Sequence, residues 1–173
     1  MPSNIEIKAH APDPARKREL AERLAGTPPT ILHHEDTFFP CAHGRLKLRQ
    51  LADDHGELIA YQRADVPGTK QSDYLLSRTD SPAELRAVLA RALGTAVVVT
   101  KTRRLYLVGQ TRVHLDEVDG LGSFLELEVV LADGQPPDEG HRIAREIMAA
   151  LEVSDADLID LAYADLLARQ QPG

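Results

Sequence analysis

Charged residues recur at every second position in several short segments that have the composition of β-strands. Arg45, Lys47 and Arg49 alternate with leucines, and the same spacing separates Glu126 from Glu128. Side chains two residues apart in a strand point to the same face. Each segment therefore carries one charged face and one apolar face, which restricts the chain to a sheet that is covered on one side only.

The pattern extends over six segments. The positions that share the charged face are Asn4, Glu6 and Lys8; Arg45, Lys47 and Arg49; Tyr61 and Arg63; Lys101 and Arg103; Arg112, His114 and Asp116; and Glu126 and Glu128. A polar face turned to water explains any one of these strands. Six such strands favour a sheet that curls into a tunnel with a charged lining. Because clustered cations repel one another, that lining predicts a bound polyanion.

The order of elements predicts an α+β fold, an antiparallel eight-stranded β-tunnel with helices packed on the outside. The expected strands are 5–10, 31–39, 45–51, 57–65, 73–78, 97–108, 111–118 and 123–131, and the expected helices are 13–25, 82–93, 141–151 and 155–169. Short turns between successive strands favour antiparallel pairing. Ser81 with Glu84 forms a capping-box signature, and Ser154 is the expected cap of the last helix. Without a repeat or a linker, residues 1–173 are expected to form a single domain.

Composition narrows the range of functions. The formal charge of −7 and the pI near 5.5 argue against a nucleic-acid partner. No apolar run is long enough to span a bilayer, and the N-terminal residues do not form a secretion signal. The single cysteine, Cys41, cannot form an internal disulfide. These features predict a cytoplasmic protein with a small-molecule partner.

The residue types on the charged face indicate phosphate chemistry. Arginine offers a planar fork to phosphate oxygens, and lysine offers a compact charge. Carboxylates beside a phosphate site are best explained as ligands for Mg²⁺ or Mn²⁺. The sequence has no glycine-rich P-loop. A triphosphate with a divalent metal is therefore the expected ligand.

These residues resemble the CYTH superfamily, the triphosphate tunnel metalloenzymes. The hallmark of that family is Glu-x-Glu-x-Lys on the first strand; Glu6 and Lys8 match it, and Asn4 stands at the first glutamate position. The resemblance continues, in the family's order, through Arg45–Arg49, Lys101–Tyr106 and Glu126–Glu128. Within the superfamily the chain is most similar to the class IV adenylyl cyclase branch, through Tyr106–Gly109, Gly120–Glu126 and Ala162–Leu167.

The resemblance implies roles for individual residues. The triphosphate-binding residues would be Lys8, Arg45, Lys47, Arg49, Arg63, Lys101, Arg103 and Arg112. The metal ligands would be Glu6, Asp116, Glu126 and Glu128, and the catalytic residues Glu6, Lys8 and Glu126. The resemblance is also compatible with a homodimer, because family members are commonly dimers.

Three functions follow as hypotheses. The first is a metal-dependent cyclase that converts ATP to cyclic AMP and pyrophosphate. The second is a triphosphatase acting on thiamine triphosphate, a nucleoside triphosphate or inorganic triphosphate. The third is a non-catalytic module that binds a nucleotide or polyphosphate, which Asn4 favours because it removes one carboxylate from the expected metal site.

Other residues are weaker candidates. His33 and His34 adjoin two acidic residues, but strand alternation puts the two rings on opposite faces. His114 is expected either to shuttle a proton or to be a hydrogen-bonded structural residue. Tyr163 either closes the tunnel mouth or belongs to the apolar face of a helix.

Overall fold

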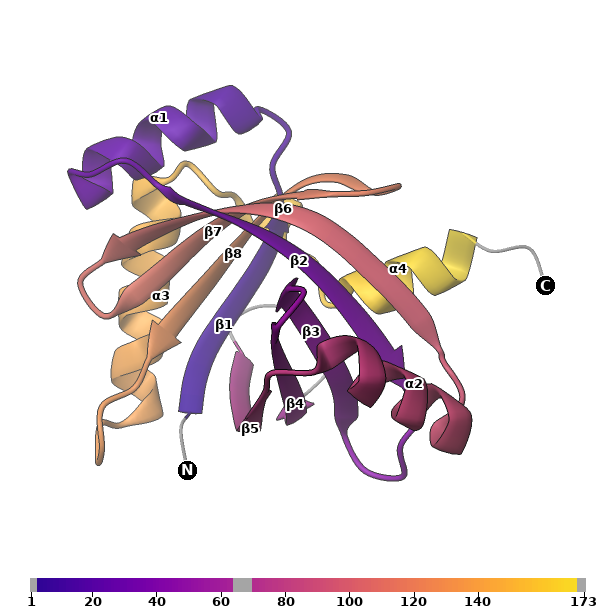
Figure 1. Cartoon of the computed structure of the whole chain (residues 1–173). Helices are drawn as coiled ribbons and strands as arrows, with labels where there is room; N and C mark the ends of the chain where they lie inside the picture. Colours follow the sequence, from indigo (N-terminus) through magenta and orange to yellow (C-terminus); the bar gives the residue numbers. More distant parts are fainter. Residues whose placement is uncertain (1–2, 64–69, 171–173) are drawn as a thin grey trace.

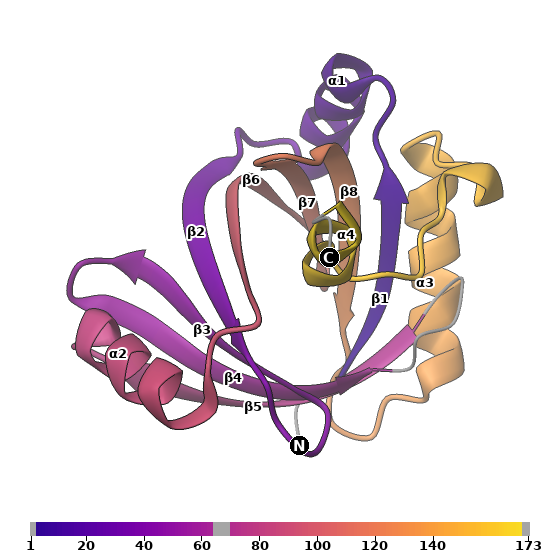
Figure 2. The same ribbon diagram turned by 90° about the vertical axis from the view of Figure 1, so that its right-hand side faces the viewer.

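A computed structural model describes residues 3–63 and 70–170. Its strands are β1 (Ser3–His10), β2 (Thr30–Phe39), β3 (Arg45–Ala52), β4 (His55–Arg63), β5 (Lys70–Thr79), β6 (Val97–Val108), β7 (Thr111–Val118) and β8 (Gly122–Val130). They form a closed barrel in the order β1-β5-β4-β3-β2-β6-β7-β8, and every neighbouring pair is antiparallel. The predicted fold is confirmed (Figures 1 and 2).

The register of the strands brings the charged positions together. Lys8 on β1 and His114 on β7 both lie opposite Glu126 on β8. Arg103 on β6 lies opposite Asp116 on β7. Because a shift of one residue would turn every side chain to the other face, this register fixes the charged face on the inside of the barrel.

The helices lie outside the barrel or at its opening. They are α1 (Pro14–Ala25), α2 (Pro82–Leu93), α3 (Pro137–Ala150) and α4 (Tyr163–Gln170). Asp13 caps α1 by accepting a hydrogen bond from the Arg16 amide, and Gly26, at φ 69°, ends it in the left-handed conformation. In Figure 2, α2 lies outside β3–β5, whereas α4 lies across the barrel opening.

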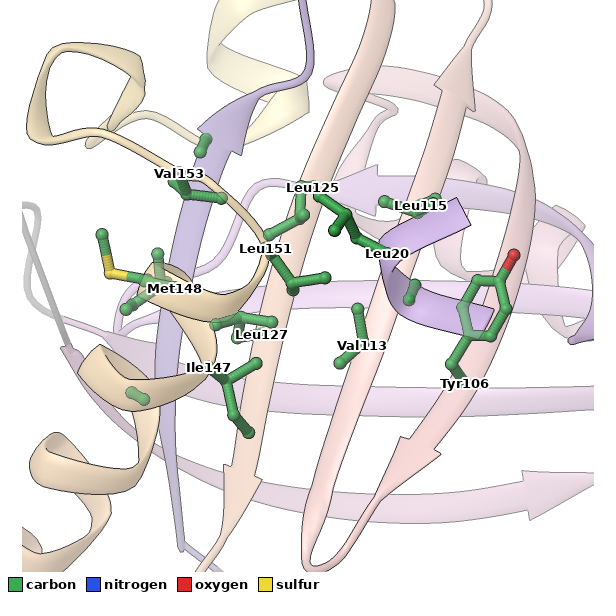
Figure 3. Close-up of a cluster of buried hydrophobic side chains, with 14 of the residues drawn as sticks. Leu20, Tyr106, Val113, Leu115, Leu125, Leu127, Ile147, Met148, Leu151 and Val153 are labelled. Carbon is green, nitrogen blue, oxygen red and sulfur yellow. The ribbon is translucent and has the colours of Figure 1, made fainter. Parts of the chain in front are cut away.

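The main apolar core lies between the barrel and helices α1 and α3. The alternate, outward-facing residues of β1, β7 and β8 form one side of it, and Leu20, Ile147 and Leu151 pack against them. Figure 3 shows these side chains converging on the outer face of β7 and β8. The strand alternation thus separates an outer apolar layer from an inner charged one.

The C-terminal part corrects one prediction. The helix expected at 155–169 is interrupted: a 3₁₀ turn at Asp155–Asp157 carries the Ser154 capping box, and α4 begins only at Tyr163. Between them the chain runs extended, because Leu158 bridges to Ala9 and the Ile159 amide donates to the Lys8 carbonyl oxygen. This pairing with β1 delivers Tyr163 to the tunnel.

The capping box predicted at Ser81 is also wrong. Ser81 occupies the N-cap position of α2, but its side chain makes no capping hydrogen bond. Its hydroxyl donates instead to the carboxylate of Asp80. The end of the expected strand 57–65 beyond Arg63 lies outside the described residues. Among those residues, no helix combines the length and the hydropathy that crossing a membrane requires.

Gly140 provides a test of the α3 packing. A Cβ at this position would lie 2.6 Å from Ile5 Cγ1 and 2.7 Å from Leu131 Cδ2. Although alanine favours a helix, the overlap should dominate, and we expect Gly140→Ala to lower the free energy of unfolding by about 1–2 kcal/mol. Chemical denaturation would measure this. Arg145→Ala, on the exposed face of the same helix, should change it by less than about 0.5 kcal/mol; equal effects would contradict the close packing.

Candidate functional site: a charged tunnel

The barrel encloses a cavity of about 550 Å³, a size that suits a small organic ligand. Its charged lining residues are Glu6, Lys8, Asp36, Lys47, Arg49, Glu57, Arg78, Lys101, Arg103, Arg112, Glu126 and Glu128. They come from all eight strands, so the tunnel brings together charges that lie far apart in the sequence.

Asp36 on β2 is the anchor of one wall. Its carboxylate accepts two hydrogen bonds from Arg49, both 2.7 Å, and one from Lys47 at 3.2 Å. Burial alone would raise the pKa of Asp36, but the charges of Lys47 and Arg49 hold that pKa well below its usual value. Asp36 is therefore ionised and fixes the direction of two cations.

Asp116 plays the same part on β7, which is separated from β2 only by β6. Its two oxygens accept hydrogen bonds of 2.7 Å from Arg103. Burial would raise the pKa of Asp116, but Arg103 lowers it far below its usual value. Both arginines bind their aspartates through Nε and Nη2. Among the described residues, neither arginine uses Nη1 in a hydrogen bond.

Lys101 lies between the two aspartates. Its Nζ is 4.0 Å from Asp36 Oδ2 and 3.8 Å from Asp116 Oδ2. Burial, together with the charge of Arg103, lowers the pKa of Lys101 to about 7. A bound anion would favour the charged form of this lysine.

One wall of the tunnel carries a group suited to a metal ion. His114, Glu126 and Glu128 each offer a ligand atom, and these atoms lie within 4.8 Å of one another. Glu6 lies opposite Glu128 in the register of β1 and β8 and lines the same cavity. Burial would raise the pKa of Glu126, but Arg103 and Lys8 keep it well below its usual value. The carboxylate is thus ionised, as a metal ligand must be.

Among the described residues, three buried polar atoms in the lining have no hydrogen-bond partner: Asn4 Oδ1, His34 Nδ1 and His114 Nδ1. Burial and the nearby Arg103 lower the pKa of His114 to about 4, so its ring is neutral at neutral pH. An unpaired polar atom in a buried site indicates a missing ligand, ion or water. The donor set on this wall therefore fits a divalent metal.

Tyr163, the first residue of α4, enters the tunnel. Its hydroxyl donates to Asp116 Oδ2 at 3.0 Å, and the Lys8 ammonium lies 4.1 Å from the centre of its ring. A second link from α4 is the ion pair of Asp165 with Arg45 at 2.9 Å. Of the two readings of Tyr163, the structure supports the one that places it at the tunnel mouth.

Most of the predicted site residues meet in this cavity. Those that line it are Glu6, Lys8, Lys47, Arg49, Lys101, Arg103, Arg112, Glu126 and Glu128. Asp116 lies beside them, and both of its carboxylate oxygens accept hydrogen bonds from Arg103. Arg45 instead donates a hydrogen bond to Asp165 of α4. Arg112 is partly exposed and pairs with Glu128 at 3.4 Å. The side chain of Arg63 lies outside the described part of the chain.

Several lining residues were not predicted from the sequence. The most important is Asp36, which shares a strand face with His34. The two-residue spacing of His34 and Asp36 is the sequence signal that puts them on one face of the strand. His33 is indeed on the exposed side, whereas His34 is buried in the lining. Tyr74 on β5 also lines the cavity, opposite Tyr61 on β4, which the sequence had placed on the charged face.

A family model for the CYTH domain matches residues 3–163. The chain belongs to the CYTH family. Members of this family bind triphosphate substrates and include triphosphatases and adenylyl cyclases. The CYTH assignment agrees with the resemblance seen in the sequence and with the closed antiparallel barrel.

Relatives of this CYTH domain are distant. A Methanocaldococcus jannaschii protein named "Putative adenylate cyclase" is 34% identical over 68 residues, which are 39% of this chain and 39% of that protein's length. The PH1012 protein of Pyrococcus horikoshii has a TM-score of 0.80 at 20% identity, over 94% of this chain and 98% of that one. The Hippeastrum protein HpAC1, described with a dominant triphosphatase activity, has a TM-score of 0.67 at 16% identity, over 96% and 95%. The PH1012 and HpAC1 structures therefore share the fold of this chain.

Asp36→Asn tests the buried anchor. The change leaves Lys47 and Arg49 buried without their counter-charge, so we expect the free energy of unfolding to fall by about 3–5 kcal/mol. Inorganic triphosphate should recover more stability in the variant than in the wild type, because its charge replaces that of Asp36. Thermal unfolding with and without the anion measures both effects. Glu19→Gln, in an exposed ion pair on α1, serves as the control and should cost at most about 1 kcal/mol; an unaltered melting temperature for Asp36→Asn would contradict the assignment.

Proposed function

We propose that this CYTH domain is a metal-dependent enzyme that acts on an organic triphosphate, with class IV adenylyl cyclase chemistry as its reaction. The observation that carries the proposal is the closed tunnel, in which cations from opposite walls surround one cavity. Lys8, Arg49 and Arg103 all reach this space from different strands. Such an arrangement is suited to a chain of phosphates that is contacted from several sides at once.

The other part of the lining favours a substrate with an organic group. Tyr61, Tyr74, Ile59, Leu51 and Leu76 contribute an aromatic and apolar surface from β3, β4 and β5. An aromatic ring offers a face on which a nucleobase can stack. Lys47, Arg49, Glu57 and Arg78 line the cavity from the same strands, so this surface is an aromatic and apolar patch within a charged lining. A base stacked on the patch would keep its phosphates beside the cations, which supports a nucleoside triphosphate over inorganic triphosphate.

In the proposed reaction the ribose 3′-hydroxyl attacks the α-phosphorus. A bond forms between the hydroxyl oxygen and the α-phosphorus, and the bond from that phosphorus to the oxygen that bridges it to the β-phosphorus breaks. The bridging oxygen departs as part of pyrophosphate, and the hydroxyl proton passes to solvent water. The arginines and lysines, fixed by Asp36 and Asp116, hold the phosphates in line and offset the charge that develops on pyrophosphate.

Glu126 and Glu128, with Glu6 beside them, are the residues that would hold Mg²⁺ or Mn²⁺. A divalent ion at this place supplies positive charge to the phosphate oxygens. Both carboxylate oxygens of Asp116 already accept hydrogen bonds from Arg103, so neither is free of other contacts for binding a metal ion. We therefore propose that Asp116 orients Arg103. The family resemblance implies a different role for it, that of a metal ligand.

Triphosphate hydrolysis is the second candidate function. The Hippeastrum protein with the same fold is described with a dominant triphosphatase activity. The same cavity would serve that reaction if water, in place of a ribose hydroxyl, attacked the γ-phosphorus. The two reactions differ in which phosphorus meets the nucleophile, and their products distinguish them.

Phosphorus NMR of the protein with ATP, thiamine triphosphate or inorganic triphosphate, each with Mg²⁺ and Mn²⁺, tests the proposal. We expect cyclic AMP and pyrophosphate from ATP, with a loss of at least about a hundredfold in rate for Glu126→Gln. Glu117→Gln, which alters an exposed carboxylate on the outer face of the same barrel wall, should retain activity. Orthophosphate release would assign a triphosphatase, and binding without any turnover would assign a non-catalytic module.

The lowered pKa of Lys101 predicts how the affinity for a triphosphate depends on pH. Its pKa of about 7 in the free protein leaves it mostly neutral above pH 7, whereas the complex favours the charged form. Binding then takes up a proton, so the affinity should fall as the pH rises from 7 to 9, by up to about tenfold per pH unit.

Titration calorimetry with a non-hydrolysable ATP analogue would measure this affinity. Phosphate groups are already ionised in this pH range, so they do not reverse the trend. Lys101→Arg keeps its charge throughout and should show a flat profile. A flat profile in the wild type would show that Lys101 stays charged in the free tunnel.

A further inference from the structure

A histidine nitrogen belongs to the same cluster as the two glutamates of the metal-binding wall. His114 projects from β7 beside Glu126 of β8, its partner in the strand register. Its ligand atom and those of Glu126 and Glu128 lie within 4.8 Å of one another. The adjacent strands therefore fix an imidazole nitrogen and two carboxylates at one point of the tunnel.

The Nδ1 atom of His114 is buried and has no hydrogen-bond partner in the described part of the chain, and the residue is only 3% exposed. Its nearest carboxylate oxygen, Glu126 Oε1, is 3.9 Å away, which is too far for a hydrogen bond. Two ligands that each lie about 2.0–2.2 Å from one ion can be separated by up to about 4 Å. The gap between nitrogen and oxygen therefore suits a shared metal ion.

The rest of the ligand set includes a neutral oxygen. Asn4 lies on the same face of β1 as Glu6, and its buried Oδ1 has no hydrogen-bond partner among the described residues. The site is thus offered an amide oxygen at this position and no carboxylate. Mg²⁺ prefers a set of oxygen ligands, whereas an imidazole nitrogen favours transition-metal ions.

We infer that His114 is a nitrogen ligand of the metal, and that it makes this site select Mn²⁺ and other transition-metal dications over Mg²⁺. The inference rests on the proposed function, because it concerns the same metal site. It assigns a role in metal choice to a residue that is neither an acid nor part of the phosphate-binding set.

Pulsed electron paramagnetic resonance of the full chain loaded with Mn²⁺ tests the inference without relying on activity. A directly bound imidazole should produce a ¹⁴N modulation, and selective labelling with ¹⁵N-histidine should convert it to the ¹⁵N pattern. This result requires no variant, so it does not depend on the folding of a mutant. Bound Mn²⁺ without nitrogen coupling would overturn the role of His114 while leaving the glutamate site intact.

Two variants assign the nitrogen. His114→Gln should abolish the modulation and weaken Mn²⁺ binding at least about tenfold, with Mg²⁺ binding changed less than about threefold, because only the transition metal gains from the nitrogen. His34→Gln is the matched control, since His34 is also buried in the lining with an unpaired Nδ1; it should retain the signal.

Calorimetry with each metal alone completes the test. Wild-type protein that binds Mn²⁺ at least about tenfold more tightly than Mg²⁺ supports the inference. Equal affinities would overturn it. A protein that binds neither ion would overturn the metal-dependent function together with this inference, so the two failures are distinct.

Discussion

The tunnel depends on two buried aspartates that hold a cluster of cations inside the barrel. Asp36 binds Arg49 and Lys47, and Asp116 binds Arg103, with Lys101 between the two carboxylates. Without these counter-charges, the mutual repulsion and the desolvation of the cations would oppose closing the barrel. Each of these arginines uses Nε and Nη2 for its aspartate, so the contacts that stabilise the barrel also fix the orientation of the guanidinium groups in the proposed triphosphate site.

Strand alternation lets one sheet serve two purposes. The outer face of β1, β7 and β8 packs against α1 and α3 in an apolar core, whereas the inner face of the barrel carries most of the buried charge. Inside, the β3–β5 wall adds Tyr61 and Tyr74, and the β7–β8 wall adds His114 and the two glutamates. The cavity thus has an aromatic end and a metal-binding end, and α4 brings Tyr163 to its mouth through the extended segment that pairs with β1.

Much of the fold was predictable because its signals are local. Strand 97–108 and helix 82–93 were predicted with the bounds that the structure has, since β-branched residues and a proline–glycine pair mark them. The last helix was predicted wrongly, because its apolar spacing continues through residues 158–162. There a backbone pairing between Ile159 and Lys8 prevails over helical propensity. That contact joins residues at opposite ends of the chain and has no local signature.

The sequence by itself determined which residues share the charged face, and hence most of the site: Lys47, Arg49, Arg103, Glu126 and others follow from a period of two. Only the tertiary structure decided how these residues pair. In the tertiary structure Asp116 binds Arg103 and Asp36 binds Arg49 and Lys47, whereas His114 Nδ1 lies beside Glu126 with no hydrogen-bond partner among the described residues. The physical reason is that alternation fixes the direction of a side chain from its neighbours in sequence. Its partners across the tunnel depend on strand register and barrel closure, which are set by contacts between distant segments.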